Sequence, residues 1–534
     1  MDATRKGITV SARTSLWCVI AVTLLAGCAA GPKPNGAPPP LASVPQAVQL
    51  AEGTFKATQA QVRYVADWKS AIQQVALQRD EAYARLTDLI ASAEFEGLTM
   101  PQQHAGLLLG GVLAMAKEHY TYAQQLLMRS SAMPEAVFAD WQARLDAAIS
   151  LRDRSDALVS LTTLLQRWPG ETAKLSPPAI RDVVLREPQT DEQRELAFQV
   201  LNRLFDLSYK MEDGVEAGPF WTALIEELVE RGQLARAARV VPRITDPYDV
   251  LWMRVDRRFD ALVRKDPRRF DELAVAGQLV EEYAQAAQRH PRSLDAVVQL
   301  TYAYLYAGRY QDVLSATNSV IARATAAGGI SALYDDVPSS LNWIYDNRAQ
   351  ALEATHRWDE AEAERVRSAN RVEHGHRNVS NVINLAGFYA NRGRGEDAVA
   401  TLRFLPSEIG SISRYGQMQV RLERLRAAVA LHDDAEVQNC LAYLRENKSD
   451  AIGSFESALL RANAADEAEQ LIIERLKDPR LRRDALLEVQ EYSFPAEPAS
   501  IEKDRALWTE ILERPAVKAA IDAVGRRERT PLPP

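Results

Sequence analysis

Histidine and cysteine, the side chains most often used for metal binding and nucleophilic catalysis, are few: seven histidines and three cysteines among 534 residues. His356 and the pair His374-Gly375-His376 fall in two successive predicted turns. A metal site would need these nitrogens to converge with a third or fourth ligand, and the pattern supplies none. His432 and Cys440 fall on different helices of one predicted hairpin, at core-facing positions. Because a nucleophilic thiol needs a lowered pKa and exposure, we expect Cys440 to be a buried structural residue.

The sequence motifs of several enzyme classes are absent. There is no H-E-x-x-H of zinc proteases, no G-x-S-x-G of α/β-hydrolases and no G-x-x-x-x-G-K-[ST] phosphate loop. Gly110-Gly111 lies inside an apolar helical segment, where glycine serves packing. Runs of carboxylates such as residues 359–362 are typical of a solvated helix surface, and no isolated catalytic pair is found. We therefore expect no enzyme activity and no cofactor.

The composition is that of a globular protein, with 47% hydrophobic, 25% charged and 7% aromatic residues. These values exclude wholesale disorder and collagen-like repeats. The formal net charge is −8, so the chain has no basic excess with which to neutralise phosphates. We expect no nucleic-acid partner.

Residues 1–27 have the layout of a secretory signal. Three basic residues precede an apolar run, residues 16–26, that is too short to span a bilayer. The run ends in Leu25-Ala26-Gly27-Cys28, which resembles the bacterial lipobox. An ordinary cleaved signal and a short transmembrane anchor are the alternatives.

The lipobox resemblance implies that Cys28 becomes the first residue of the mature protein and carries a diacylglyceryl thioether and an N-acyl chain. More than one acyl chain gives stable membrane anchoring. Ala29, rather than Asp, follows the cysteine, and in lipoprotein sorting of the enteric type this implies the periplasmic face of the outer membrane. Cleavage would remove three basic groups and one acidic group, leaving a net charge of −10. Cys440 would then be the only thiol left, which excludes an intramolecular disulfide.

Residues 28–45 are rich in proline, glycine and alanine and favour an extended tether. From residue 46 onward the dominant period is helical, with alanine and leucine at i, i+3, i+4 and i+7 and hardly any strand signal. We expect helices over residues 46–104, belonging to one or two degenerate helix pairs. The fold class predicted for the body is all-α.

Internal repeats give the all-α body its architecture. After Trp141 come Leu145, Ala148 and Ala157, and Pro169 closes the segment 28 residues after the tryptophan. This spacing resembles the tetratricopeptide repeat, W-x2-L-G-x2-Y…A-x3-F…P. The copies begin near residues 107, 141, 221, 297, 345, 382, 425 and 459. The resemblance implies an α-solenoid over residues 105–478; another all-α array is the alternative.

Each tetratricopeptide unit is a pair of antiparallel helices that cannot bury its apolar stripe alone, so that stacking makes a continuous core. Small residues of the first helix should face small residues of the second: Gly111, Ala349 and Ala386 opposite Ala123, Ala361 and Ala398. The turn between the helices should hold a left-handed residue at Gly232, Gly308 and Gly393.

Some segments depart from the repeat. Arg144 and Arg348 stand where the pattern has leucine. Residues 170–217 and 245–293 are too long for one period and indicate degenerate or extra helices, and Gly328-Gly329 to Pro338 indicates an inserted loop. Residues 479–534 should form a cap of short helices, over 485–492, 501–513 and 515–526, with a disordered tail.

The first helices of stacked units line a concave groove, which in this family binds peptides or partner helices. We predict a partner-binding groove at the positions between core residues: Tyr302, Tyr306, Trp343, Asp346, Gln350, Asn384 and Asn391. Aromatic rings beside amides and a carboxylate suit a peptide backbone or a sugar. The alternative is that the aromatic residues pack between units. The groove lacks the basic clamp of carboxylate-binding tetratricopeptide domains.

Three functions are compatible with these features. The first is a lipid-anchored periplasmic scaffold or adaptor that holds an envelope protein, of the type used in envelope assembly or polysaccharide export. The second is an activator lipoprotein of a peptidoglycan synthase, and the third is a carbohydrate-binding outer-membrane lipoprotein. The sequence identifies neither the partner nor the pathway.

Overall fold

The computed structural model describes residues 67, 70, 71 and 79–533, except 187, 212–213, 327–328, 374–375, 406–411 and 494–497. The signal segment, Cys28 and the tether lie outside the described residues. The chain divides after Tyr209 into two compact units, the N-terminal unit up to Tyr209 and the C-terminal unit from Lys210. Within the described ranges, every helix is too short or too polar to cross a membrane.

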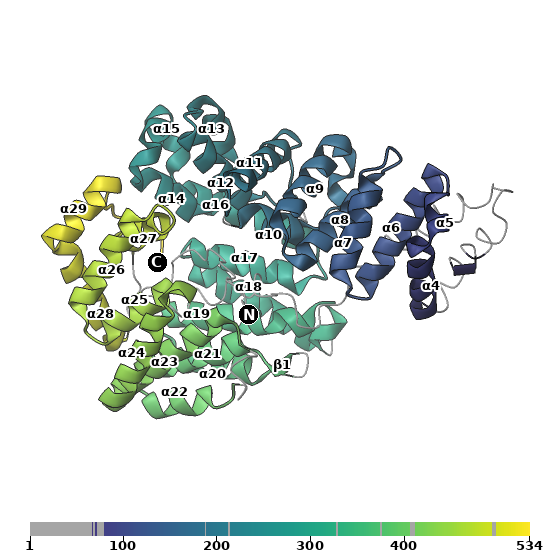
Figure 1. Ribbon diagram of the computed structural model, residues 1–534. Coiled ribbons are helices and arrows are strands. Elements are labelled where there is room, and N and C mark those ends of the chain that lie inside the picture. Colours follow the sequence, from purple (N-terminus) through teal and green to yellow (C-terminus); the bar gives the residue numbers. More distant parts are fainter. Residues whose placement is uncertain are drawn as a thin grey trace. The chain divides into compact units, whose positions relative to one another are not determined.

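The N-terminal unit consists of helices (Figure 1). They are α4 (Arg79–Ala91), α5 (Ala93–Glu96), α6 (Met100–Ala116), α7 (Tyr120–Ser131), α8 (Phe138–Leu151), α9 (Arg154–Arg167), η1 (Pro169–Lys174), α10 (Pro177–Leu185) and α11 (Asp191–Asp206). Consecutive helices pack on one another from α6 to α9, and α9 packs on α11. The described part of residues 46–104 is helical, as predicted.

The C-terminal unit is also helical. Its first half has α12 (Gly218–Glu230), α13 (Leu234–Val240), η3 (Val241–Arg243), α14 (Pro247–Val255), η4 (Arg257–Phe259), α15 (Asp260–Lys265), η5 (Pro267–Phe270), α16 (Glu272–Arg289), α17 (Leu294–Tyr306) and α18 (Tyr310–Ala326). The second half has η6 (Ile330–Ala332), α19 (Val337–Ala354), α20 (Trp358–Asn370), α21 (Val379–Asn391), α22 (Gly395–Leu402), α23 (Arg414–Leu431), α24 (Asp434–Glu446), η8 (Lys448–Asp450), α25 (Ile452–Arg461), α26 (Ala465–Lys477), α27 (Arg482–Glu488), α28 (Ala499–Glu513) and α29 (Pro515–Val524).

The strands of the described residues are β1 (Val372–Glu373) and β2 (His376–Arg377), which pair antiparallel in a short hairpin between α20 and α21. The prediction of an all-α protein is therefore confirmed, with this one small addition. The extra helices predicted in the two long gaps are also present, as α10 and α11 and as α14 to α16. Within the expected insertion, residues 329–336 form a connection that contains only η6.

All eight predicted repeats are helix pairs, from α6–α7 to α25–α26. One residue in each inter-helix turn has a positive φ between 57° and 75°: Glu118, Arg152, Gly232, Gly308, His356, Gly393, His432 and Asn463. The amide of the next residue donates to the carbonyl five positions earlier, as in Arg394 N to Tyr389 O at 2.9 Å. This recurring turn ends the first helix and reverses the chain. The left-handed conformation predicted for Gly232, Gly308 and Gly393 is confirmed.

The pairs also stack as in a tetratricopeptide array. The second helix of a pair packs on the first helix of the next pair, as α20 does on α21 and α22 on α23. First helices of successive pairs pack as well, as α17 does on α19 and α21 on α23. The structure is thus an all-α, tetratricopeptide-like array of helix pairs.

Small residues bring the helices of α6–α7 close together. A Cβ atom at Gly111 would lie 2.6 Å from Cγ of Leu127 on α7, and a Cβ atom at Gly110 would lie 2.5 Å from Ile90 on α4. Real Cβ atoms are not found that close, so both glycines serve packing, as predicted. The neighbour of Gly111 in this contact is Leu127, one turn beyond the predicted Ala123.

The two arginines that replace leucine each pair with a carboxylate on the second helix of their repeat. Arg144 donates from Nε to Asp156 Oδ1 at 2.9 Å, across the α8–α9 pair. Arg348 donates from Nε to Glu364 Oε1 at 3.2 Å, across the α19–α20 pair. Each arginine lies eight residues before the left-handed turn residue. The same position therefore holds an ion pair between the two helices in both repeats.

The C-terminal segment forms the three predicted helices and then an ordered tail. Leu532 is fully buried, and the hydroxyl of Tyr248 donates a hydrogen bond to the carbonyl of Pro533. The expectation of a disordered tail is corrected by these contacts. The contact of Tyr248 with Pro533 spans 285 positions, and no local sequence pattern records such a contact.

Candidate functional site

The predicted groove residues lie mostly inside the C-terminal unit. Tyr306 is partly exposed, and the other six are buried: Tyr302, Trp343, Asp346, Gln350, Asn384 and Asn391. They belong to the first helices α17, α19 and α21, as expected. They do not form an open surface, so we do not assign them direct contact with a partner.

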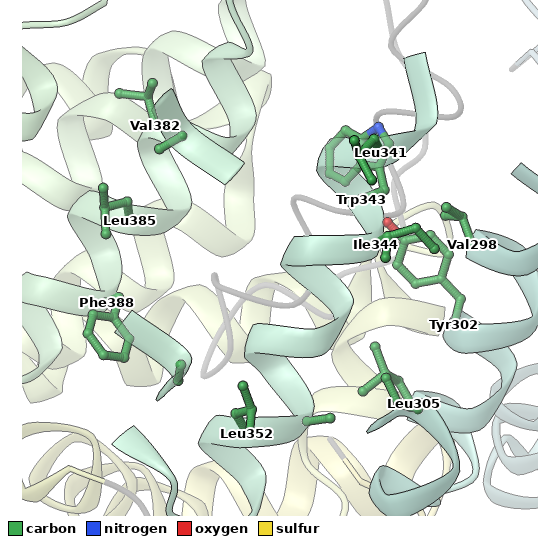
Figure 2. Packing of buried hydrophobic residues seen from close by; sticks show 14 of the residues in the cluster. Val298, Tyr302, Leu305, Leu341, Trp343, Ile344, Leu352, Val382, Leu385 and Phe388 are labelled. Atoms are coloured by element: carbon green, nitrogen blue, oxygen red, sulfur yellow. The ribbon is translucent and has the colours of Figure 1, made fainter. Parts of the chain in front are cut away.

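Tyr302 and Trp343 are part of a hydrophobic core. Figure 2 shows both rings with the aliphatic side chains of α17 and α19 around them, among them Val298, Leu305 and Ile344. Tyr302 and Trp343 are each 8% exposed. Their packing between successive helix pairs agrees with the alternative interpretation of the aromatic residues.

Three of the predicted residues meet at one buried ion pair. Asp346 on α19 binds Arg365 on α20, and both side chains are at most 1% exposed. Gln350 Nε2 donates to Asp346 Oδ2 at 2.9 Å, and Asn384 Nδ2 donates to Asp346 Oδ1 at 3.1 Å. Both amide nitrogens thus donate to the same buried carboxylate inside the fold.

The same arginine has a second carboxylate partner. Arg365 Nε donates to Glu353 Oε1 at 2.8 Å. Burial raises the pKa of Glu353, while the charge of Arg365 and its hydrogen bond act in the opposite direction. A charge that is removed from water is tolerated only when it is paired and hydrogen-bonded, which is what this cluster provides.

Asn391 is covered by the C-terminal helix α28. Its Oδ1 accepts from Arg461 Nη2 at 3.1 Å, and its backbone carbonyl accepts from Ser500 Oγ at 2.6 Å. Arg461 in turn donates from Nε to Asp504 Oδ2 at 2.8 Å. Residues 499–513 therefore lie against α21 and α25, the first helices of two pairs, on the face where an open groove was expected.

Further buried arginines pair with carboxylates in the following repeats. Arg426 Nη1 donates to Glu423 Oε1 at 2.8 Å within α23. Arg475 on α26 binds both Glu456 on α25 and Glu488 on α27, and its guanidinium is fully buried. We refer to the pairs of Arg365, Arg426, Arg461 and Arg475 as the buried arginine row. Sequence reasoning missed it, although charged residues at otherwise apolar helix positions are a visible signal.

Cys440 has the environment of a structural thiol. It is fully buried, and its Sγ donates to Glu436 Oε1 at 3.4 Å. Burial, with the nearby charge of Glu436, raises the pKa of Cys440 to about 12. The thiol is therefore protonated at neutral pH, which does not favour nucleophilic chemistry. His432 occupies the left-handed turn before α24.

The histidines do not assemble a metal site in the described part of the chain, where no group of three or more histidine, cysteine, aspartate or glutamate residues has the required geometry. His374 and Gly375 lie outside the described residues, and so does the side chain of His376. His356 occupies a left-handed turn, and its ring packs edge-on against Trp358 with centroids 5.9 Å apart.

An exposed apolar patch lies at the β hairpin. Val372 and Phe404 are 59% and 56% exposed. Arg377 links them, since it pairs with Val372 in the hairpin and places its guanidinium 4.0 Å from the centroid of the Phe404 ring. We call Val372, Arg377 and Phe404 the outer patch. Sequence analysis did not identify it, because no motif distinguishes these residues.

No protein-family model and no curated protein sequence matches the chain. Among solved structures, a structure of Naa15/Naa10 bound to HypK-THB is similar at 11% identity over 90% of each chain, with a TM-score of 0.26. The APC/C hetero-tetramer Cut9-Hcn1 is similar at 12% identity over 96% of this chain and 98% of that chain, also with a TM-score of 0.26.

A circular tandem repeat protein with a novel repeat topology is similar at 13% identity over 94% of this chain and 98% of that chain, with a TM-score of 0.13. All three TM-scores are below 0.5, so these likenesses carry no argument about function. The description of the fold rests on the helix pairs and their turns.

Proposed function

We propose that this protein is a lipid-anchored periplasmic adaptor of the outer membrane, which holds a partner protein of the cell envelope near the leaflet and catalyses no reaction. The proposal rests on two features of the same chain, its N-terminal signal and its helical body. The sequence up to Cys28 resembles a lipoprotein signal, and the body that follows is an array of stacked helix pairs. Such arrays offer large surfaces to other proteins.

The proposed mechanism is tethering. Acyl chains on Cys28 would confine the body to one leaflet, and residues 28–45 would extend over roughly 55 Å if they adopt polyproline II. Confinement by a short tether raises the effective concentration of a bound partner at the membrane. The adaptor therefore needs no chemistry of its own.

The ionisable groups of the body support a non-catalytic role. The buried carboxylates Asp346, Glu423 and Glu456 each bind a buried arginine of the same chain. Their charges are thus used to satisfy one another inside the fold. The protonated thiol of Cys440 agrees with the same interpretation.

The outer patch is the surface that we assign to partner contact. Exposed aromatic and arginine side chains are enriched at protein interfaces, where the ring supplies apolar area and the guanidinium supplies hydrogen bonds. In the outer patch, an arginine lies directly on an exposed phenylalanine ring. Burial of Phe404 by a partner would remove most of its remaining exposed area from water.

The adaptor proposal is tested by chemical crosslinking in intact cells, followed by purification of the full-length protein. We expect Phe404→Ala with Val372→Ala to reduce the yield of a crosslinked envelope protein at least fivefold. Leu273→Ala is the matched control, because Leu273 is 49% exposed but lies outside the outer patch. If no envelope protein is recovered with the wild-type chain, the proposal fails.

The anchor is tested separately by labelling cells with radioactive palmitate. We expect label on the wild-type protein and none on Cys28→Ala, and we expect the wild-type protein in the outer-membrane fraction. An unlabelled wild-type protein would contradict the lipid anchor without bearing on the crosslinked partner.

A further inference from the structure

Residues 525–533 lie across the C-terminal unit as an extended peptide. We call residues 525–533 the tail. The backbone of Glu491 binds it twice: Glu491 N donates to Glu528 O at 2.9 Å, and Thr530 N donates to Glu491 O at 2.9 Å. Backbone pairing of this kind is how many proteins capture an extended segment of another chain.

Side chains of the tail alternate between inside and outside. Thr530 and Leu532 are buried, whereas Arg529 and Pro531 are exposed. The hydroxyl of Thr530 donates to Glu272 Oε1 at 3.1 Å. Alternation with period two is that of an extended strand bound on one face. Pro533 departs from the alternation, since it is also buried.

Three tyrosine side chains pack together where Tyr248 binds the tail. Tyr248 on α14 packs edge-to-face on Tyr306 of α17, with centroids 5.8 Å apart, and against Tyr492 after α27, with centroids 6.4 Å apart. Tyr248 donates its hydroxyl hydrogen to the carbonyl of Pro533. We call Tyr248, Tyr306 and Tyr492 the tyrosine site.

The turn of one repeat completes the tyrosine site. Cδ of Pro533 lies 3.9 Å from the position that a Cβ atom would take at Gly308, between α17 and α18. Aromatic rings with a hydroxyl that donates to a carbonyl next to proline are the groups that bind proline-containing extended segments. Such segments bind at low entropic cost, because proline restricts them before binding.

Ion pairs fix the tail on its other side. Arg254 on α14 donates from Nε to Glu528 Oε2 at 2.8 Å and from Nη2 to Glu272 Oε1 at 2.9 Å. Burial alone would lower the pKa of Arg254, but the hydrogen bond and the charge of Glu272 raise it overall. Arg254, which binds Glu528 of the tail, is therefore positively charged at any physiological pH.

We propose that the tyrosine site is a peptide-binding site for extended segments that contain Pro-Leu-Pro, and that the chain's own tail occupies it until a partner's segment replaces it. Another extended segment could make the same contacts, because the backbone of Glu491 and the hydroxyl of Tyr248 bind main-chain groups of the tail. The occupant is identified by the tail itself, whose residues 530–533 read Thr-Pro-Leu-Pro. This inference deepens the adaptor proposal by naming the chemistry of the partner's segment.

The test uses a fluorescent peptide with the sequence of residues 529–534, RTPLPP, and measures its anisotropy. A chain that ends at Arg529 should bind the peptide saturably. The full chain should bind it at least tenfold more weakly, because the tail competes for the site. A peptide with alanine at the three prolines, RTALAA, should not bind to either chain.

A pair of tyrosine variants in the shortened chain tests the assigned residue. Tyr248→Phe removes the hydroxyl that binds the Pro533 carbonyl and should weaken peptide binding about threefold to tenfold. Tyr443→Phe is the matched control and should leave binding unchanged, since the hydroxyl of Tyr443 donates to Gln417, away from the tail.

If the shortened chain does not fold, Leu532→Ala in the full chain replaces it. This variant weakens the tail's own contact and should bind RTPLPP more tightly than the wild type does. The proposal is overturned if a folded shortened chain does not bind the peptide, if it binds RTALAA equally well, or if Leu532→Ala binds no better than the wild type. Any of these results would leave the crosslinking test of the adaptor unaffected.

Discussion

The helix pairs α6–α7 and α19–α20 have the same turn but different interiors. In both, a left-handed residue, Glu118 or His356, is followed by an amide that donates five residues back at 2.9 Å. The interior of α6–α7 is aliphatic around Gly111, and its buried His104 and Ser130 both contact Asp140 of the next helix, α8. The interior of α19–α20 holds the buried pair Asp346–Arg365. The comparison teaches that the turn defines the hairpin, whereas very different interiors can fill it.

The largest effect should come from breaking the buried arginine row. Arg475→Met removes the buried cation that binds both Glu456 and Glu488 in the core, and such a loss costs about 3–5 kcal/mol. Urea unfolding followed by circular dichroism measures it. Adding Glu456→Gln and Glu488→Gln to Arg475→Met should recover much of the loss, because the two carboxylate charges that Arg475 balanced are then removed as well. A triple variant as unstable as the single one would contradict this explanation.

The two equivalent arginines should have a smaller and similar effect. Arg144→Met and Arg348→Met each remove hydrogen bonds to a carboxylate that is about one-tenth exposed, worth about 1.5–3 kcal/mol. Arg309→Met is the control, because its exposed ion pair with Asp312 is worth less than about 1 kcal/mol. Thermal unfolding compares the three. Unequal losses at Arg144 and Arg348 would show that the shared position does not have a shared role.

Two glycines inside helices allow the effect of side-chain packing on stability to be distinguished from that of helix propensity. Gly111→Ala forces a Cβ atom against Leu127 and should cost about 1–3 kcal/mol. Gly277→Ala on α16 is the matched control, since nothing lies within 4 Å of its new Cβ atom. It should stabilise the protein by up to about 1 kcal/mol through helix propensity. Equal effects in chemical denaturation would mean that α6 and α7 are not in close contact.

The smallest effect concerns the turn that both pairs share. His356→Gly relieves a left-handed backbone that costs a residue with a side chain about 1–2 kcal/mol, partly offset by the greater freedom of glycine when unfolded. The melting temperature should therefore rise slightly. Gly393→Ala, at the equivalent turn, should lower it by a similar amount. A gain in stability for Gly393→Ala would contradict the shared turn.

The sequence predicted the local part of this architecture well. The eight helix pairs and the left-handed turns at Gly232, Gly308 and Gly393 follow from spacing within about 34 residues. The alanines that repeat at this spacing are buried, so that periodicity alone locates them. Arg144 and Arg348 interrupted the pattern visibly, although their ion pairs appeared only in three dimensions.

The candidate site could not be predicted in the same way. Asn391 lies on the expected face of α21, but α28, more than a hundred residues later in the chain, covers it. Pro533 contacts Tyr248 over 285 positions. Nothing in a short window of sequence encodes such distant contacts. The sequence therefore placed the predicted groove residues on the correct helices, but it did not predict that six of the seven are buried.

The central claim is that the body is a series of helix pairs that are closed by the same turn, and hydrogen exchange tests it most directly. The amides of Arg357, Arg394 and Asp433 lie in turns but donate to carbonyls five residues earlier. Residue-resolved exchange by mass spectrometry should show all three protected, like amides inside the flanking helices. Exchange of these amides at the rate of an unstructured peptide would contradict the account.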